Sequence, residues 1–105
     1  MQNEPKSLFG KRLREARLRI GLAQDKLGVL IGLDEGCSSA RISRYETGVH
    51  EPPFETAKNI AFALNVPVAY FYCMQDDLAE LLVITHKISN EERQALIAFL
   101  KKTAQ

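Results

Sequence analysis

The chain has 105 residues and a formal net charge of +1, with 46% hydrophobic and 26% charged residues. This length allows one modest core, and this composition excludes an intrinsically disordered chain. No apolar run approaches the roughly 18 residues that span a bilayer, and the first residues lack a secretory pattern, so we expect a cytoplasmic protein with no membrane partner. Two distant cysteines, Cys37 and Cys73, predict neither a disulfide framework nor a metal site.

The positive charge is concentrated near the amino terminus. A near-neutral total is unusual for a protein that binds a polyanion. Within residues 1–24, however, six basic side chains accompany only two acidic ones, and the rest of the chain has an acidic surplus. The net charge therefore does not exclude a nucleic-acid partner.

Apolar spacing predicts the first two helices. Between residues 7 and 20 the apolar residues recur at intervals of three and four, which places them on one face of a helix that Gly21 ends. A shorter second helix is predicted over residues 24–31, with Gly32 closing it.

A polar link is predicted before the third helix. No regular element explains residues 33–38, and Ser38 or Ser39 is a natural N-cap. The third helix is therefore expected over residues 39–46, with Gly48 as its left-handed terminator.

Four further helices follow. Two prolines precede a helix at residues 54–64, a brief helix is predicted at 66–71, and one with an acidic first turn at 76–86. Ser89 and Glu92 form a capping box for the last helix. The sequence contains no strand pattern, so the predicted fold class is all-α.

The segment from Leu8 to Phe71 resembles the phage repressor and Cro-like (xenobiotic-response-element type) helix-turn-helix family of transcriptional regulators. The resemblance rests on three stretches in order and near family spacing, which are Gly21-Leu22-Ala23-Gln24, Ile42-Ser43-Arg44-Tyr45-Glu46-Thr47-Gly48, and Ala57 to Val66 followed by Phe71. It implies a five-helix lambda-repressor-like DNA-binding domain at residues 7–72. Residues 76–105 would add a C-terminal two-helix extension.

The third helix supplies side chains suited to reading a major groove. That groove is about 12 Å wide and admits one helix that presents short or bidentate polar groups. Ile42 and Tyr45 can anchor the inner face. The side chains left to face the bases are Ser39, Ala40, Ser43 and Arg44. Arg44 can bond guanine O6 and N7, Ala40 can touch a thymine methyl group, and the serines can bond base edges or phosphate.

Three more side chains are candidates for phosphate contacts. The resemblance implies such a contact for Gln24 at the start of the second helix, where it sets position rather than sequence. Ser38 and Arg41 are further candidates. The two serines, Ser38 and Ser39, can instead act as caps alone, and Arg41 and Arg44 can be solvated surface side chains.

The predicted link departs from the family pattern, because helix-turn-helix connections usually contain about 3 to 4 residues. A longer link would shift the recognition helix. The placement of Ser39 and Ala40 depends on that link more than the placement of Arg44 does.

The resemblance also implies a structural ion pair between Arg17, late in the first helix, and Glu46, at the end of the third. Such a pair would tie the two helices together. If it is partly buried, removal of one partner should cost on the order of 3 kcal/mol or more.

The last thirty residues are too few to bury a core of their own. The expected helices there carry large apolar side chains beyond what one contact face requires, which are Leu78, Leu81, Leu82, Leu96, Phe99 and Leu100. We expect them to form a two-fold dimer interface. The alternative is that they pack on the rest of the same chain.

Nothing in the sequence indicates an enzyme, a cofactor or a metal. A glycine-rich phosphate loop, a metal-ligand cluster and a Ser-His-Asp arrangement are all missing. The expected protein is a homodimeric, sequence-specific DNA-binding regulator that acts as a repressor on an inverted-repeat operator in double-stranded DNA. The alternative is a helix-turn-helix protein-interaction module or an antitoxin-type partner of another protein.

Overall fold

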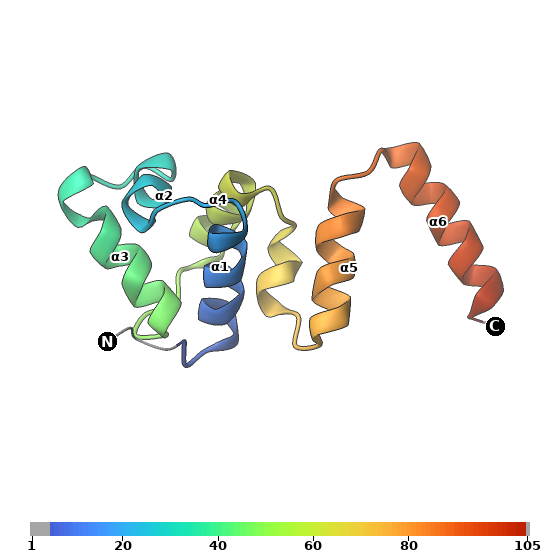
Figure 1. Ribbon diagram of the computed structural model, residues 1–105, viewed down its shortest axis with the longest axis horizontal. Coiled ribbons are helices and arrows are strands. Elements are labelled where there is room, and N and C mark those ends of the chain that lie inside the picture. Colours follow the sequence, from blue (N-terminus) through green and yellow to red (C-terminus); the bar gives the residue numbers. More distant parts are fainter. Residues whose placement is uncertain (1–4, 105) are drawn as a thin grey trace.

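The computed structural model describes residues 5–104, and every regular element in that range is helical (Figure 1). In chain order the elements are α1 (Leu8–Arg19), α2 (Gln24–Leu30), α3 (Glu35–Thr47), α4 (Phe54–Leu64), the 3-10 helix η1 (Val68–Tyr72), α5 (Asp76–His86) and α6 (Asn90–Thr103). The all-α prediction is confirmed. None of the described helices is long and apolar enough to cross a membrane.

The helices form an elongated body with extents of 51 × 24 × 24 Å. α3 lies toward one end and α6 at the other, with α1, α4, η1 and α5 between them (Figure 1). The long axis therefore separates the predicted DNA-reading helix from the last helix of the chain.

One apolar core joins the helices from α1 to α5. Its largest buried apolar side chains come from five of these elements, and they are Phe9, Leu13, Leu27, Ile42, Tyr45, Ile60, Leu64, Tyr70 and Phe71. The rings of Phe9 and Phe71 pack with their centroids 4.8 Å apart. α5 adds Ala79 and Val83 to the same cluster, whereas α6 has no buried residue.

Local caps form three of the helix ends, and the sequence predicts two of them, at Gly48 and at Ser89. The Ser7 side chain accepts a hydrogen bond from the Gly10 N–H at the start of α1. Gly48 ends α3 with φ of 85°, a conformation that favours glycine. Ser89 and Glu92 form both hydrogen bonds of the predicted capping box at the start of α6.

The start of α3 differs from the sequence prediction. Because α2 ends at Leu30 and α3 begins at Glu35, the connection contains only residues 31–34, the usual length for a helix-turn-helix. The predictions of a non-helical link over 33–38 and of a helix starting at Ser38 or Ser39 are wrong. The Ser38 side chain is buried between the two helices, and this tertiary contact outweighs weak local helix propensity.

The short fifth element lies close to its predicted position but has different geometry. It is a 3-10 helix that begins at Val68 rather than Val66, and Pro67 is its N-cap residue. Phe71 is buried as expected, Val68 packs partly buried against the core, and Tyr70 is also buried.

Candidate nucleic-acid interface

α3 has two chemically different faces. Its buried residues are Ser38, Ile42, Tyr45 and Glu46. Its opposite face exposes Ser39, Ala40, Arg41 and Arg44, with Ser43 half-buried beside them. Within residues 5–104 neither Arg41 nor Arg44 has an acidic side chain within ion-pair distance. The side chains with which α3 is predicted to read bases therefore lie on its solvent side.

α2 and α3 approach most closely at Gly28 and Ser38. A Cβ atom on Gly28 would lie 2.3 Å from the Ser38 Cβ and 2.8 Å from its Cα. The Ser38 hydroxyl donates to the Asp25 carbonyl at 3.0 Å and has no exposed surface. The structure thus corrects the assignment of Ser38 to a phosphate contact, because its side chain is occupied inside the helix pair.

A buried carboxylate, Glu46, joins the first three helices. Its Oε1 accepts hydrogen bonds from Arg14 Nε at 3.2 Å and from Arg17 Nη2 at 3.2 Å. Its Oε2 pairs with Arg17 Nε. Gln24 Nε2 also donates to Oε1, at 3.1 Å. Glu46 is fully buried, so these donors replace the water that it loses on folding.

The Arg17–Glu46 pair implied by the family resemblance is present, and two residues that sequence reasoning missed support it. Arg14 is the second arginine on Glu46. Gly10 allows α1 to approach α3, since a Cβ there would lie 2.1 Å from the Glu46 carbonyl oxygen. The three-residue spacing of Arg14 and Arg17 places them on one helix face, a signal that could have indicated their shared role.

Gln24 lies at the start of α2 beside the exposed face of α3. While its Nε2 donates to Glu46, its Oε1 accepts from the Ser39 hydroxyl at 3.5 Å. Its amide therefore links α2 to an inward and to an outward residue of α3. This places Gln24 where the buried contacts of α3 meet the candidate DNA surface.

The opposite end of the molecule has an apolar groove between α5 and α6, about 410 Å³ in volume. Its lining residues are Cys73, Leu78, Leu81, Leu82, Thr85, Arg93, Leu96, Ile97 and Leu100. Five of the six predicted dimerisation residues therefore line one groove. Phe99 is outside the lining and 64% exposed, while Ile97, which the sequence analysis did not single out, is part of it.

Hydrogen bonds from Arg93 connect α6 to the end of α5 and to the link that follows it. Its Nε donates to the Thr85 carbonyl at 3.1 Å and its Nη2 to the Ile88 carbonyl at 3.4 Å. α5 packs on the core through Ala79 and Val83, but the described part of the chain does not cover the apolar face of α6. Packing on the same chain thus covers one face of α5, whereas Leu78 and Leu81 on α5 and the apolar side chains of α6 remain uncovered.

Comparison with known proteins adds independent findings. The helix-turn-helix family model matches residues 13–71. Two proteins named uncharacterized HTH-type transcriptional regulators, from Sinorhizobium medicae (strain WSM419) and Rhizobium meliloti (strain 1021), are each 35% identical over 63 residues, which is 60% of this chain. The match spans only 42% of the length of each of these curated relatives.

A solved structure resembles a larger part of the chain. The crystal structure of the transcriptional regulator BswR aligns with a TM-score of 0.84 and 41% sequence identity. The alignment covers 89% of this chain and 92% of that one. The likeness to BswR therefore extends beyond the 59 residues of the family match.

Proposed function

Since the chain belongs to the Cro/C1-type helix-turn-helix family, we propose that it is a sequence-specific DNA-binding transcriptional regulator that inserts α3 into the major groove. The observation that carries this proposal is the division of α3 into two faces. Its inward residues are buried and hydrogen-bonded, and its outward residues are short or basic. A helix with this outward face suits base edges and phosphates.

Each outward side chain has a proposed role. Arg44 bonds guanine O6 and N7, and Ala40 contacts a thymine methyl group. Ser39 and Ser43 bond base edges or phosphate. Arg41 neutralises a phosphate, and Gln24 contacts the backbone from the start of α2.

The local charge of α3 supports this docking mode despite the net charge of only +1. The buried Glu46 carboxylate is compensated by Arg14 and Arg17. Between residues 39 and 44 the charged side chains are Arg41 and Arg44, both basic and exposed. A polyanion approaching that part of α3 meets positive charge.

We propose that a second copy of the chain covers the groove between α5 and α6. Groove residues such as Leu81 and Leu100 remain 43% and 42% exposed in one chain. A second copy presents the same apolar surface, so a two-fold axis lets each protomer cover the other. Two copies would then bind inverted half-sites about 34 Å, or a multiple of that distance, apart. Repression follows if the occupied operator blocks polymerase.

The direct test selects bound sequences from a pool of random double-stranded DNA. The expected result is an enriched inverted repeat. Affinity for it should fall steeply with salt, because log K changes by about 0.9 per neutralised phosphate for each unit of log salt. Failure to enrich any motif, together with a flat salt dependence, would contradict DNA binding and favour a protein-interaction module.

Replacement of Arg44 by alanine tests the base-reading role. We expect a loss of about 1 to 3 kcal/mol at the selected site and relaxed preference at one base position. Lys87→Ala is the control, because it removes the same charge from the exposed end of α5. Unchanged affinity and base preference in Arg44→Ala would contradict the role.

Sedimentation equilibrium of the full chain tests the dimer. At tens of micromolar we expect a dimer for the parent chain and a monomer for Leu81→Asp, because a carboxylate would be buried in the covered groove. The control is Phe62→Asp on α4, where Phe62 is 91% exposed and lies outside the groove. A monomeric parent chain at that concentration would contradict the dimer.

A further inference from the structure

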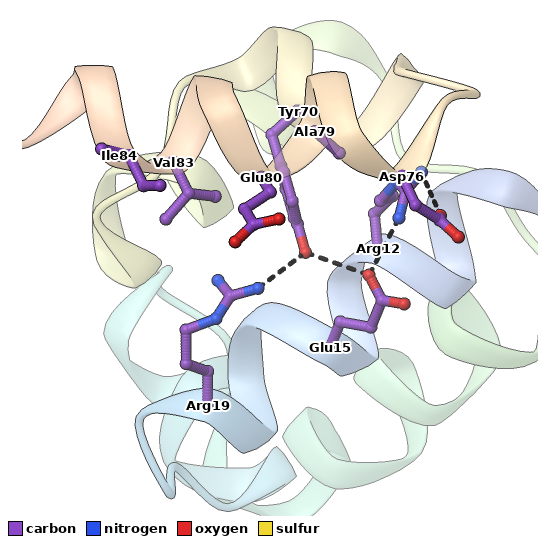
Figure 2. A pocket seen from close by; sticks show the side chains of 9 residues that line it. All are labelled: Arg12, Glu15, Arg19, Tyr70, Asp76, Ala79, Glu80, Val83 and Ile84. Carbon is purple, nitrogen blue, oxygen red and sulfur yellow. Dashed lines mark hydrogen bonds and ion pairs between the residues drawn. The ribbon is translucent and has the colours of Figure 1, made fainter.

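α1 carries a second set of polar side chains, distinct from the pair that holds α3. Arg12, Glu15 and Arg19 recur at intervals of three and four and therefore share a helix face. Figure 2 shows these side chains directed toward η1 and α5, where they line a cavity of about 470 Å³. α1 thus lies between the reading helix and the groove-forming helix and is bonded to the elements on both sides.

Arg12 is the most buried member of this set, with only 2% of its side chain exposed. Its Nε and Nη2 donate to the Cys73 carbonyl at 3.0 and 2.8 Å, and Nη2 also reaches the Met74 carbonyl at 3.3 Å. Its Nη1 donates to Glu15 Oε1 at 3.0 Å. Its Nη2 lies 3.0 Å from Asp76 Oδ1, on the first residue of α5.

Tyr70 extends the connection along α1. Its hydroxyl donates to Glu15 Oε1 at 3.2 Å and accepts from Arg19 Nη2 at 3.3 Å (Figure 2). Lys11 adds an exposed contact to Asp76 at 3.3 Å. The pKa of Asp76 is lowered, first by its hydrogen bond to Arg12 and then by the one to Lys11, which agrees with this geometry.

A buried arginine is not needed merely to hold two helices together. Burial of a guanidinium removes its hydration, and replacement of buried ion pairs by apolar side chains is often neutral or stabilising. The planar guanidinium instead orients its partners, because its five N–H donors point in fixed directions. Arg12 directs its donors at the link between η1 and α5. Together with the packing of Ala79 and Val83 on the core, it restrains the angle at which α5 leaves the core.

We propose that Arg12 is a positioning residue that sets the spacing between the two half-sites of the operator. This inference rests on the proposed function. α3 is bonded to α1 through Glu46, and α5, one wall of the groove that a second copy covers, is bonded to α1 through Arg12. The angle at Arg12 therefore determines how far apart a dimer holds its two reading helices.

The length of the molecule makes this spacing sensitive to small angles. The long axis measures 51 Å. Because Arg12 lies between α3 and α6, the lever is about half that length, and a tilt of about 8° moves its end by roughly 3.5 Å, close to the rise of one base pair. Loss of the Arg12 contacts should therefore allow more than one spacing.

The test measures binding of the full chain to DNA duplexes that carry two copies of the selected half-site at the preferred spacing or one base pair more or less. The parent chain should prefer one spacing by at least about tenfold, because each base pair also rotates the half-site by about 34°. Arg12→Met should reduce this preference to less than about threefold, by the same geometry. Its dimer mass and its affinity for a single half-site should not change.

Two further variants keep the test decisive if Arg12→Met does not fold. Arg12→Lys keeps the charge but lacks the planar fork, and Asp76→Asn removes only an exposed carboxylate. Both should weaken the spacing preference, Asp76→Asn less strongly. Lys58→Met, which disrupts an exposed ion pair on α4, should retain the full preference.

The outcomes separate this inference from the proposed function. If folded variants at Arg12 and Asp76 keep the parent preference for one spacing, the inference is overturned while DNA binding stands. If the parent chain selects no inverted repeat, the proposed function fails and this inference fails with it.

Discussion

Core helices and the last helix contain similar apolar side chains in opposite environments. Leu13 and Ile42 have no exposed surface, whereas Leu100 and Phe99 of α6 are 42% and 64% exposed. From α1 to α5 the apolar faces of several helices converge on one cluster, but α6 flanks only α5. An apolar stripe in a sequence thus predicts that a face will be covered without identifying what covers it.

The polar contacts of the two regions differ in the same way. In the core region, Glu46 is buried and joins three helices through side chains distant in sequence. In α6 the main polar contacts are those of Arg93 and the local Ser89 capping box. We therefore expect large, concentration-independent effects of substitutions in the core and smaller, partner-dependent effects in α6.

The largest effect is expected for Glu46→Ala. It should lower the free energy of unfolding by about 3 to 5 kcal/mol, because Arg14 and Arg17 would be left largely buried without their counter-charge. Urea unfolding followed by circular dichroism measures this. Glu55→Ala, which affects an exposed pair on α4, should change stability by less than about 0.5 kcal/mol. Equal stabilities of the two variants would contradict a larger contribution from the buried Glu46 than from the exposed Glu55.

A smaller loss, about 1 to 3 kcal/mol, is expected for Gly28→Ala, since the new methyl group would overlap Ser38. The matched control is Gly36→Ala in the first turn of α3, where a Cβ would have nothing within 4 Å. That control should stabilise the protein by about 0.5 to 1 kcal/mol, because alanine is the better helix former. The same unfolding experiment compares them, and a stable Gly28→Ala protein would contradict the tight helix crossing.

Ser89→Ala tests how the cap of α6 contributes to the stability of the protein. It removes the acceptor for the Glu92 N–H and should lower stability by about 1 kcal/mol. If α6 is covered only in a dimer, this loss should appear in thermal unfolding at high protein concentration and vanish at concentrations where the chain is monomeric. The same loss at every concentration would mean that α6 unfolds together with the core of its own chain.

The smallest expected effect is a pH dependence at Asp76. Its pKa is lowered by hydrogen bonds to Arg12 and Lys11, so the ionised form is favoured in the folded state. Its contribution to stability is therefore present above the ordinary carboxyl pKa of about 3.9 and is lost as the pH falls through the lowered value. Acid titration of the parent chain and of Asp76→Asn should show a shallower decline for the variant. Identical profiles would contradict the contribution.

The helix ends that the sequence predicts correctly depend on neighbouring residues. The Ser89 capping box joins atoms three residues apart, and Gly48 needs only its own backbone conformation. The sequence mispredicts the start of α3 because that start depends on the packing of Ser38 against α2. The Ser38 hydroxyl donates to the carbonyl of Asp25, thirteen residues earlier in the chain. Local composition around Gly36 gives no indication of that contact.

The candidate site follows the same division between local and distant contacts. Helical periodicity around Ile42 and Tyr45 sufficed to place Arg44 on the outer face of α3. The role of Arg12 could not be read in this way, because the Cys73 carbonyl to which it donates lies 61 residues away.

The two-faced build of α3 has a consequence for how such a protein can acquire new targets. The contacts that hold α3 in the fold are made by Ser38, Ile42 and Glu46, whose side chains are buried. Substitutions at exposed positions such as Ala40 and Arg44 leave those contacts untouched. Evolution or design can therefore change the DNA sequence that such a helix prefers without changing the fold that holds it.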